Sequence, residues 1–107
     1  MVIERFEVYL APLDPTQGVE MGKTRPCLVI SPDEMHRTVR SIIVAPMTST
    51  RRSFPFRVDC VFAEREGQIA LDQMRSLDQK RFIRRLGRLD HATAARVAQT
   101  LAAFFRL

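Results

Sequence analysis

Apolar and polar residues alternate over much of this chain at the two-residue period that is typical of β-strands. The apolar-polar pattern predicts six strands, over 5–13, 26–31, 41–48, 56–62, 68–74 and 82–89. The strand over 26–31 is apolar on both faces, so we expect it to be central, while Pro46 indicates an edge or a bulge near the end of the strand over 41–48. Charged turns are expected at 64–67 and 78–81. Short strands separated by turns favour a small β-barrel over a βαβ sheet.

The period changes to 3.6 residues near the C-terminus. Asp90 is expected to cap a helix whose apolar stripe packs on the strands and consists of Ala94, Val97, Ala98, Leu101, Phe104 and Phe105. A single helical turn is also expected after the second strand, with Ser31 as its cap and Pro32 at its first position. A chain of 107 residues has room for one core, so residues 1–107 are predicted to form a single domain.

Composition narrows the class of protein further. The hydrophobic fraction of 46% and the charged fraction of 27% are those of an ordinary globular protein. No apolar run approaches the length of about 20 residues that crosses a bilayer, and the N-terminus lacks the pattern of a signal peptide, so a cytoplasmic protein without membrane contact is expected. Cys27 and Cys60 lie in apolar, strand-like runs and match no metal-binding or redox spacing. Both are expected to be buried, reduced thiols.

Arginine dominates the positive charge. The formal net charge is +5, and of the 17 basic residues only Lys23 and Lys80 are lysines. The planar guanidinium group matches phosphate in shape and charge, which favours a nucleic acid or another polyanion as partner. A solvated basic surface with no specific partner explains the same composition, so charge alone leaves both interpretations open.

A polar segment with glycines at 18 and 22 leads into the apolar strand over 26–31, and it belongs to a set of separated motifs. In chain order they are 13–18 (LDPTQG), 18–26 (GVEMGKTRP), 31–35 (SPDEM), 44–49 (VAPMTS), 54–56 (FPF), 71–78 (LDQMRSLD) and 86–88 (LGR). In this order they resemble the MazF/PemK family of toxin ribonucleases. The resemblance implies a mainly β fold, a small SH3-like β-barrel of about six strands with a C-terminal α-helix, of the CcdB/PemK type.

The resemblance also implies an activity and partners. It suggests a homodimeric toxin of a type II toxin-antitoxin system that is inhibited by a cognate antitoxin protein. Its reaction would be metal-independent, sequence-specific cleavage of single-stranded RNA, in which the RNA's own 2′-hydroxyl attacks the phosphate and leaves a 2′,3′-cyclic phosphate and a 5′-hydroxyl. No cofactor is expected.

The chain's own residues limit how such a reaction is performed. His36 and His91 are far apart in sequence and lie beside no candidate loop, and the acidic residues show no metal-ligand spacing, so neither a histidine pair nor a metal site is expected. By residue type alone, Arg25 is as well explained as a phosphate ligand as by an ion pair with Glu20 or Asp72 that anchors the loop. The resemblance assigns catalytic positions to Arg25 and Thr48, and the role of base to Glu20.

Polar and cationic side chains around these residues are expected to contact RNA, the amides and hydroxyls at base edges and the cations at the backbone. They are Thr16, Gln17, Lys23, Thr24, Ser49, Arg51, Arg52, Gln73, Arg75 and Ser76. One departure from the family is Phe6-Glu7 at the start of the first strand, where many members have Gly-Asp. The larger side chain is expected to change packing near the barrel mouth and so the preference for substrate.

Two other classes of function remain open on the sequence. A non-catalytic, CcdB-like toxin that binds a protein target such as gyrase uses the same barrel, although such toxins lack the pair of arginine and threonine. An SH3-like module that binds proline-rich peptides needs an aromatic groove, which the absence of Trp and the single Tyr disfavour.

Overall fold

The computed structural model describes residues 2–107 and consists of strands joined by loops, with two helices. Its elements are β1 (Glu7–Pro12), β2 (Thr24–Val29), α1 (Asp33–Thr38), β3 (Ser41–Thr48), β4 (Arg57–Phe62), β5 (Arg65–Ala70), the 3₁₀ turn η1 (Leu71–Gln73), β6 (Arg75–Asp78), the 3₁₀ turn η2 (Gln79–Arg81), β7 (Arg84–Arg88) and α2 (His91–Phe104). The mainly β class with a C-terminal helix, predicted from the sequence, is confirmed.

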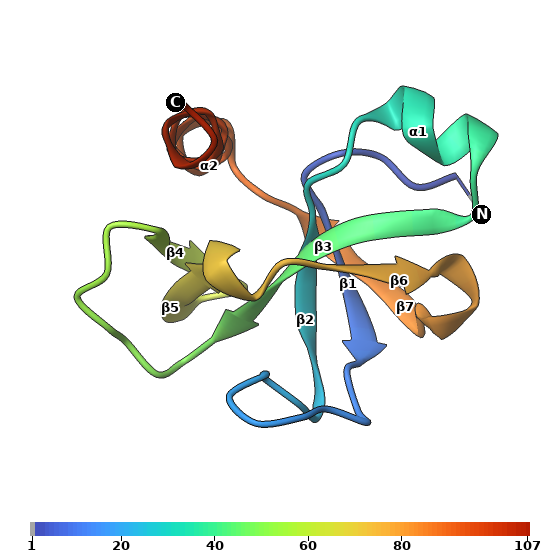
Figure 1. Cartoon of the computed structure of the whole chain (residues 1–107), viewed down its shortest axis with the longest axis horizontal. Coiled ribbons are helices and arrows are strands. Elements are labelled where there is room, and N and C mark those ends of the chain that lie inside the picture. The colour runs from blue at the N-terminus through green and yellow to red at the C-terminus, as the bar shows by residue number, and fades with distance from the viewer. Residues whose placement is uncertain (1) are drawn as a thin grey trace.

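All neighbouring strands in the described chain are antiparallel, in the order β4-β5-β3-β2-β1-β7, and β6 pairs with β3 outside this path. Strand β3 crosses the centre of the molecule, with β4 and β5 on one side and β1, β6 and β7 on the other (Figure 1). The sheet curls into a half-barrel because β3 pairs with β6 through Ser41–Val44 and with β5 through Met47–Thr48. One long strand therefore joins two small sheets.

Pro46 lies at the point where β3 changes partner, between the residues paired with β6 and those paired with β5. The expectation that this proline marks an edge strand is wrong, because β3 is central and Pro46 itself pairs with Cys27 of β2. Proline has no N–H to donate to a ladder. It is tolerated inside the strand because the ladder on the other side is interrupted at that residue.

The curled sheet carries a hydrophobic cluster on each face. Val8, Leu28, Met47 and Ile69 belong to one cluster, which α2 covers with Ala94 and Val97. Tyr9, Cys27, Val44 and Leu77 belong to the other. Residues adjacent in a strand point to opposite faces, so a central strand between two clusters is apolar at nearly every position.

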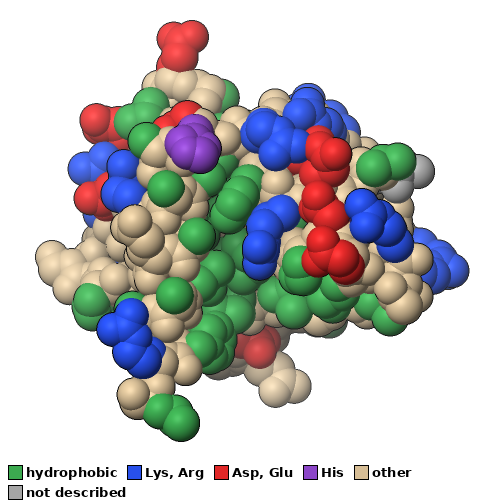
Figure 2. Space-filling model, turned by 90° about the horizontal axis from the view of Figure 1, so that it is seen from above, with side chains coloured by type: hydrophobic (Ala, Val, Ile, Leu, Met, Phe, Trp, Pro, Cys, Tyr) green, Lys and Arg blue, Asp and Glu red, His purple; other side chains and the backbone are tan. Residues whose placement is uncertain are grey.

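Helix α2 begins as predicted, because the Asp90 carboxylate accepts a hydrogen bond from the Thr93 backbone N–H at 3.0 Å. Ala94 and Val97 of its apolar stripe are buried and Leu101 is half-buried, whereas Ala98 is exposed and Phe104 and Phe105 are 43% and 67% exposed. Figure 2 shows hydrophobic side chains gathered along the depression beside this helix. The expectation that the whole stripe packs on the barrel is therefore confirmed for Ala94, Val97 and Leu101, and is wrong for Ala98, Phe104 and Phe105.

One strand prediction is wrong, and a further strand is missed beside it. The expected strand over 68–74 is β5, which ends at Ala70, followed by the turn η1, and β6 over Arg75–Asp78 is a separate strand that the pattern did not separate. Leu71 is fully buried, so the apolar run continues through the corner although the strand does not. Strand β5 pairs with the end of β3, whereas β6 pairs with the beginning of β3. The chain makes the turn η1 between them in order to move from one end of β3 to the other.

Two turns also differ from expectation. The β4–β5 hairpin turns at Ala63 and Glu64, whose φ angles are 51° and 64°, rather than over 64–67, and residues 65–67 belong to β5. Two consecutive positive φ angles give the tight hairpin turn that matches strand twist. The cap of α1 is Pro32 and not Ser31, because the Ser31 hydroxyl hydrogen-bonds His36 at 2.6 Å and accepts from the Ile43 N–H at 3.0 Å.

Candidate active site

A groove of about 520 Å³ opens at the end of the sheet where β2 begins and β3 ends. Six of the seven strands in the described chain contribute to its lining, and only β6 does not. Its floor is apolar and consists of Leu10, Pro26, Met47, Cys60, Phe62 and Leu86. Its polar and charged lining consists of Thr24, Arg25, Thr48, Ser49, Arg65, Glu66, Gln68 and Arg84. An apolar floor with a largely cationic rim suits a planar base attached to a phosphate.

Arg25 and Thr48 line this groove from neighbouring strands. In the antiparallel register of β2 and β3, Cys27 pairs with Pro46, and continuing it by two residues places Arg25 across from Thr48. The two residues are far apart in the sequence, yet side chains opposite each other in a ladder point to the same face. The structure therefore brings together the two residues to which the family resemblance assigns catalysis.

The Arg25 side chain is fixed at one point and free at the other. Its Nε–H donates to the Gly22 carbonyl oxygen at 2.7 Å, while its terminal nitrogens make no hydrogen bond to any residue in 2–107. The alternative that Arg25 anchors the loop through Glu20 or Asp72 is wrong, because Asp72 pairs with Arg57 at 2.5 Å and Glu20 makes no ion pair within that range. A half-buried guanidinium group without an anion is ready to bind one.

Asp72 is fully engaged by its own partner. The Arg57 guanidinium donates to both of its carboxylate oxygens, and this hydrogen bonding lowers the pKa of Asp72 below its ordinary value. The pair ties β4 to η1 on the far side of β5 from Arg25.

Thr48 is only 7% exposed, at the last position of β3. Its hydroxyl oxygen accepts a hydrogen bond from the Thr50 backbone N–H at 3.1 Å, which leaves the hydroxyl proton available for donation. Gly67 packs directly against this residue, since a Cβ atom at position 67 would lie 2.6 Å from the Thr48 carbonyl oxygen. A side chain larger than hydrogen at residue 67 displaces the end of β3.

Gln68 is a functional candidate that sequence reasoning missed. It lines the groove at 5% exposure and pairs with Thr48 across the β3–β5 ladder. Its side-chain amide binds both the N–H and the C=O of Arg52, so it holds the loop that follows Thr48. A glutamine directly before the apolar run over 69–71 was the available signal, because a buried amide must be hydrogen-bonded.

Glu20 lies on the long loop between β1 and β2, which carries Thr16, Gln17 and Lys23 as well. Its carboxylate accepts from the Gln17 backbone N–H at 2.7 Å and does not line the groove. The loop is closed at its neck by the Leu13 N–H to Lys23 carbonyl bond and by the Asp14 carboxylate, which accepts from the Lys23 N–H. The proposed base therefore stands on the loop beside the groove and is not directed into it.

Several predicted RNA contacts hold this loop in place. The Gln73 side chain accepts from the Met21 N–H at 3.0 Å, and Arg75 donates to the Leu13 carbonyl oxygen at 3.0 Å. Arg81, which was not among the predicted contacts, donates to the Asp14 carbonyl oxygen. In this structure these side chains form the base of the β1–β2 loop rather than part of the groove lining.

The remaining predicted contacts divide by position. Thr24 and Ser49 line the groove beside Arg25 and Thr48. Arg51 forms an exposed ion pair with Glu66 at 3.5 Å, and Arg52 is exposed in the same loop. Ser76 is exposed on β6, opposite Ile43, toward the other end of β3. The rim cations Arg65 and Arg84 were not predicted, because their approach to the groove depends on the curl of the sheet.

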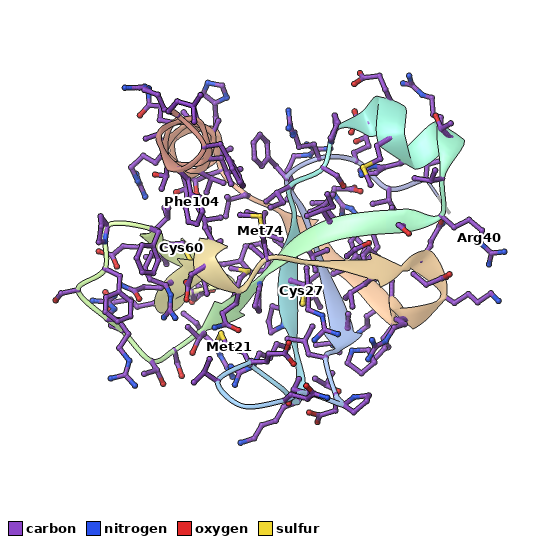
Figure 3. The ribbon with its side chains drawn as sticks, in the orientation of Figure 1. Met21, Cys27, Arg40, Cys60, Met74 and Phe104 are labelled. Carbon is purple, nitrogen blue, oxygen red and sulfur yellow. The ribbon has the colours of Figure 1, made fainter. Side chains whose placement is uncertain are left out.

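The histidines and cysteines lie outside the chemistry of the groove. His36 hydrogen-bonds the Ser31 hydroxyl and the Ile3 carbonyl oxygen, and His91 is exposed on the first turn of α2. Both cysteines are buried and free, as expected, and burial raises the pKa of Cys27 to about 12. Figure 3 shows Cys27 in the central strands and Cys60 in the β4–β5 hairpin.

Residues 2–107 offer neither a metal-binding cluster nor a helix that spans a membrane. No group of three or more His, Cys, Asp or Glu side chains in that range is arranged to hold a metal ion. No helix within the same range has the length and hydrophobicity needed to cross a membrane.

The segment Phe6-Glu7, where the chain departs from the family pattern, lies outside the groove lining. Phe6 has a φ of 70°, a region that glycine enters at little cost, and its ring packs against the hydrophobic cluster covered by α2. Glu7 is 5% exposed and accepts hydrogen bonds from Arg85 at 2.6 Å, the Glu4 N–H and the Tyr9 hydroxyl. The larger pair of residues therefore changes the core and a buried ion pair, and does not line the groove itself.

The fold and the groove define a class of protein that the family comparison identifies. Residues 4–105 match the family described as the PemK-like, MazF-like toxin of type II toxin-antitoxin systems. Because this match covers nearly the whole chain, the chain belongs to that family, and the resemblance inferred from the motifs is confirmed.

Individual relatives agree with this assignment. Endoribonuclease PemK of Escherichia coli is 37% identical over 83 residues, which cover 73% of this chain and 62% of PemK, slightly less than two thirds of its length. Endoribonuclease EndoA of Bacillus subtilis (strain 168) is 33% identical over 107 residues, with coverage of 94% and 92%. Crystal structures of Deinococcus radiodurans MazF, Form-I, and of its MazE-MazF complex, Form-III, have TM-scores of 0.84 and 0.78 to this chain, each at 26% identity with coverage of 97% and 96%.

Proposed function

We propose that this protein is the toxin of a type II toxin-antitoxin pair and acts as an endoribonuclease on single-stranded RNA. The observation that supports this function best is that Arg25 and Thr48 line one groove, and that the terminal guanidinium nitrogens of Arg25 bind no group within residues 2–107. The relatives named endoribonuclease support the same activity.

The proposed reaction is a transesterification within the RNA. A base removes the proton of the 2′-hydroxyl, the 2′-oxygen forms a bond to the adjacent phosphorus, and the bond from phosphorus to the 5′-oxygen breaks. Arg25 stabilises the charge on the phosphorane oxygens and hydrogen-bonds the leaving 5′-oxygen, which takes up a proton from solvent water as it departs, while the protonated base returns its proton to the solvent. Thr48 donates its hydroxyl proton to the same phosphate. The products are a 2′,3′-cyclic phosphate and a 5′-hydroxyl, and no metal ion takes part.

Glu20 is the proposed base, and its position sets a condition on the mechanism. Its carboxylate now accepts from the Gln17 N–H, so the loop must rearrange when RNA binds in order to direct the carboxylate to the 2′-hydroxyl. An exposed carboxylate is a weak base until the bound substrate excludes water. We therefore assign to Glu20 a smaller share of the rate enhancement than to Arg25 or Thr48.

RNA is proposed to enter along the cationic rim. Arg65 and Arg84 line the groove and form no ion pair with any residue in 2–107. Thr24 and Ser49 offer hydroxyl groups to base edges beside the scissile phosphate. Thr16, Gln17, Lys23, Arg51 and Arg52 lie on the two loops next to the groove and are proposed to contact flanking nucleotides.

The proposed partners are a cognate antitoxin protein and a second copy of the chain. The family description and the MazE-MazF structures of Deinococcus radiodurans support an antitoxin. The exposed phenylalanines at the end of α2 offer apolar surface for a homodimer. The proposed location is the cytoplasm, where RNA and antitoxin are both present. Light scattering of the purified protein, with an expected mass of two chains, tests the dimer.

The function is tested by incubating purified protein with unstructured RNA of mixed sequence in EDTA and sequencing the fragment ends. We expect cuts at a short common sequence with 2′,3′-cyclic phosphate and 5′-hydroxyl ends. Arg25→Ala and Thr48→Ala each remove one preorganised contact and are expected to slow cleavage about 100-fold or more. Arg40→Ala is the matched control, because Arg40 is exposed on the side of the molecule away from the β4–β5 hairpin (Figure 3).

Two results would overturn the proposal. The first is the absence of cleavage of any RNA by folded protein, which together with inhibition in a DNA supercoiling assay would favour a CcdB-like binder. The second is an Arg25→Ala variant that cuts at the parent rate.

A further inference from the structure

We infer that Gln68 is a positioning residue for the Thr48 hydroxyl, acting through the loop that follows β3. This inference rests on the proposed function, because it assigns a role to Gln68 in the same reaction. Gln68 is not itself directed at the reacting atoms, and the observations concern three hydrogen bonds of its side chain, two to Arg52 in the loop after Thr48 and one to Asp59.

Thr48, Gln68 and Asp59 form a row of polar side chains across β3, β5 and β4. Thr48 of β3 pairs with Gln68 of β5, which pairs on its other side with Asp59 of β4. Residues paired directly across antiparallel strands share a face, so the three side chains lie next to one another. The Gln68 Nε2 donates to an Asp59 carboxylate oxygen at 2.9 Å. This bond holds the nitrogen end of the amide on the side of β4.

The amide then pairs with the backbone of the loop at two points. Its Oε1 accepts from the Arg52 N–H at 3.0 Å, and its Nε2 donates to the Arg52 carbonyl oxygen at 2.9 Å. Both Nε2 protons are used, one on Asp59 and one on Arg52. Because Gln68 is 5% exposed, water does not readily replace these bonds, and the loop is held four residues after Thr48.

The held loop in turn orients the catalytic hydroxyl. The N–H of Thr50, midway between Thr48 and Arg52, donates to the Thr48 hydroxyl oxygen at 3.1 Å. With that lone pair occupied, the hydroxyl proton is the group left to donate to a phosphate in the groove. Loss of the Gln68 amide frees the loop, and the Thr48 hydroxyl loses a fixed orientation while remaining in the groove. Small misplacements of a catalytic group are known to lower rates by up to about 100-fold.

A double-mutant cycle with Thr48 tests the inference. Gln68→Met keeps the length of the side chain and removes all three hydrogen bonds, so we expect kcat to fall about 10-fold while KM changes less than about threefold. If Gln68 acts through Thr48, adding Gln68→Met to Thr48→Ala changes kcat no further. Gln99→Met, at an exposed position on α2, is the matched control and is expected to match the parent.

A second variant separates the amide bonds from general stability. Gln68→Glu keeps the acceptor for the Arg52 N–H and loses both donors, and Asp59→Asn added to it supplies a donor for the new carboxylate. We expect Gln68→Glu to be as slow as Gln68→Met, and the double variant to recover part of kcat with an unchanged thermal midpoint. This pair also serves if Gln68→Met does not fold, which circular dichroism reports.

The outcomes separate the inference from the function on which it rests. If Gln68→Met and Gln68→Glu cut at the parent rate while Thr48→Ala does not, the role of Gln68 is wrong and the nuclease proposal stands. If the effects of Gln68→Met and Thr48→Ala multiply, Gln68 acts on the fold and not through Thr48, and the inference is again wrong. If Thr48→Ala itself is fully active, the proposed function fails first.

Discussion

Arg84 and Arg85 are neighbours on β7, yet their surroundings differ completely. Arg85 turns to one face of the β1–β7 pair and donates to the buried Glu7 carboxylate at 2.6 Å, where Tyr9 and the Glu4 N–H also donate. Arg84 turns to the other face, lines the groove and has no ionic partner within residues 2–107. Arg88, on the same strand as Arg85, donates to Glu4. We call the four residues Glu4, Glu7, Arg85 and Arg88 the paired cluster.

The difference indicates which charges serve the fold and which serve the substrate. In the paired cluster each carboxylate has an arginine, since Arg88 donates to Glu4 as Arg85 does to Glu7. Around the groove, Arg25, Arg65 and Arg84 form no ion pair with any carboxylate in residues 2–107. The half-buried Arg25 costs stability unless an anion binds it, whereas the exposed Arg65 and Arg84 are solvated until RNA binds. Substitutions in the paired cluster should therefore lower stability, and substitutions in the groove should lower activity.

The largest effect that would separate the two regions is expected for Glu7→Ala. The substitution leaves three donors without an acceptor, so we expect a loss of about 3 kcal/mol in the free energy of unfolding, measured by urea denaturation. RNA cleavage by the folded fraction at low temperature should stay within about twofold of the parent. Cleavage that falls much further at equal folded fraction would show that the paired cluster also serves the reaction.

Glu20 is the acidic residue of the groove region whose role is least determined by contacts. Glu20→Gln keeps an acceptor for the Gln17 N–H but cannot take a proton, so kcat is expected to fall about tenfold, the acid limb of the pH profile to change and the thermal midpoint to stay constant. Glu34→Gln, exposed on α1, is the control. An unchanged kcat would assign the base to another group.

The unpaired rim cations predict a salt effect. For fully 2′-O-methylated RNA, which cannot be cut, each phosphate contact contributes about 0.7 to the slope of log affinity against log salt. Arg65→Gln and Arg84→Gln should each lower that slope by about 0.7, or roughly threefold in affinity over a fourfold change in salt, without loss of stability. Arg40→Gln should leave the slope of the parent unchanged. If Arg65→Gln and Arg84→Gln also keep the slope of the parent, these two arginines do not belong to the RNA-binding surface.

The smallest expected effect is the acid sensitivity of the paired cluster. Burial by itself raises the pKa of Glu7, but hydrogen bonds from Arg85, the Glu4 N–H and Tyr9 outweigh it, so its pKa lies below the ordinary 4.5. A carboxylate whose pKa is lower in the folded state than in the unfolded state stabilises the fold at pH values above its unfolded-state pKa. That stabilisation is lost as the pH falls through its folded-state pKa. Parent and Glu7→Gln should therefore differ most in unfolding free energy near neutral pH and converge below about pH 4.5. A constant difference would contradict this.

The fold was predictable where local signals were complete. The bounds of β3 and the Asp90 cap of α2 agree with the pattern, because alternation and capping act within a few residues. The corner at η1 was missed because Leu71 stays buried through it, and a period alone does not distinguish a bent run from a straight one. Pro46 was misjudged because its tolerance depends on β5 and β6, which pair with β3 from much further along the chain.

The candidate site was predictable where the family motif names a residue. Arg25 and Thr48 came from the resemblance, and the register of β2 and β3 supplies the geometry that brings them together. Gln68 could not be assigned, since its role depends on a loop residue 16 positions away. Gln73 and Arg75 were expected to touch RNA because of their type, but their present bonds are to the β1–β2 loop. Their contact with RNA stays a prediction.

The groove is lined by strands from both ends of the chain, and this has a consequence during protein synthesis. Leu10 and Arg84 both line it and pair across β1 and β7, so the cleft is complete only when segments separated by most of the chain have met. Contacts of such long range form late in folding. The nascent chain therefore lacks a complete groove until nearly all of it has been translated and β7 has paired with β1.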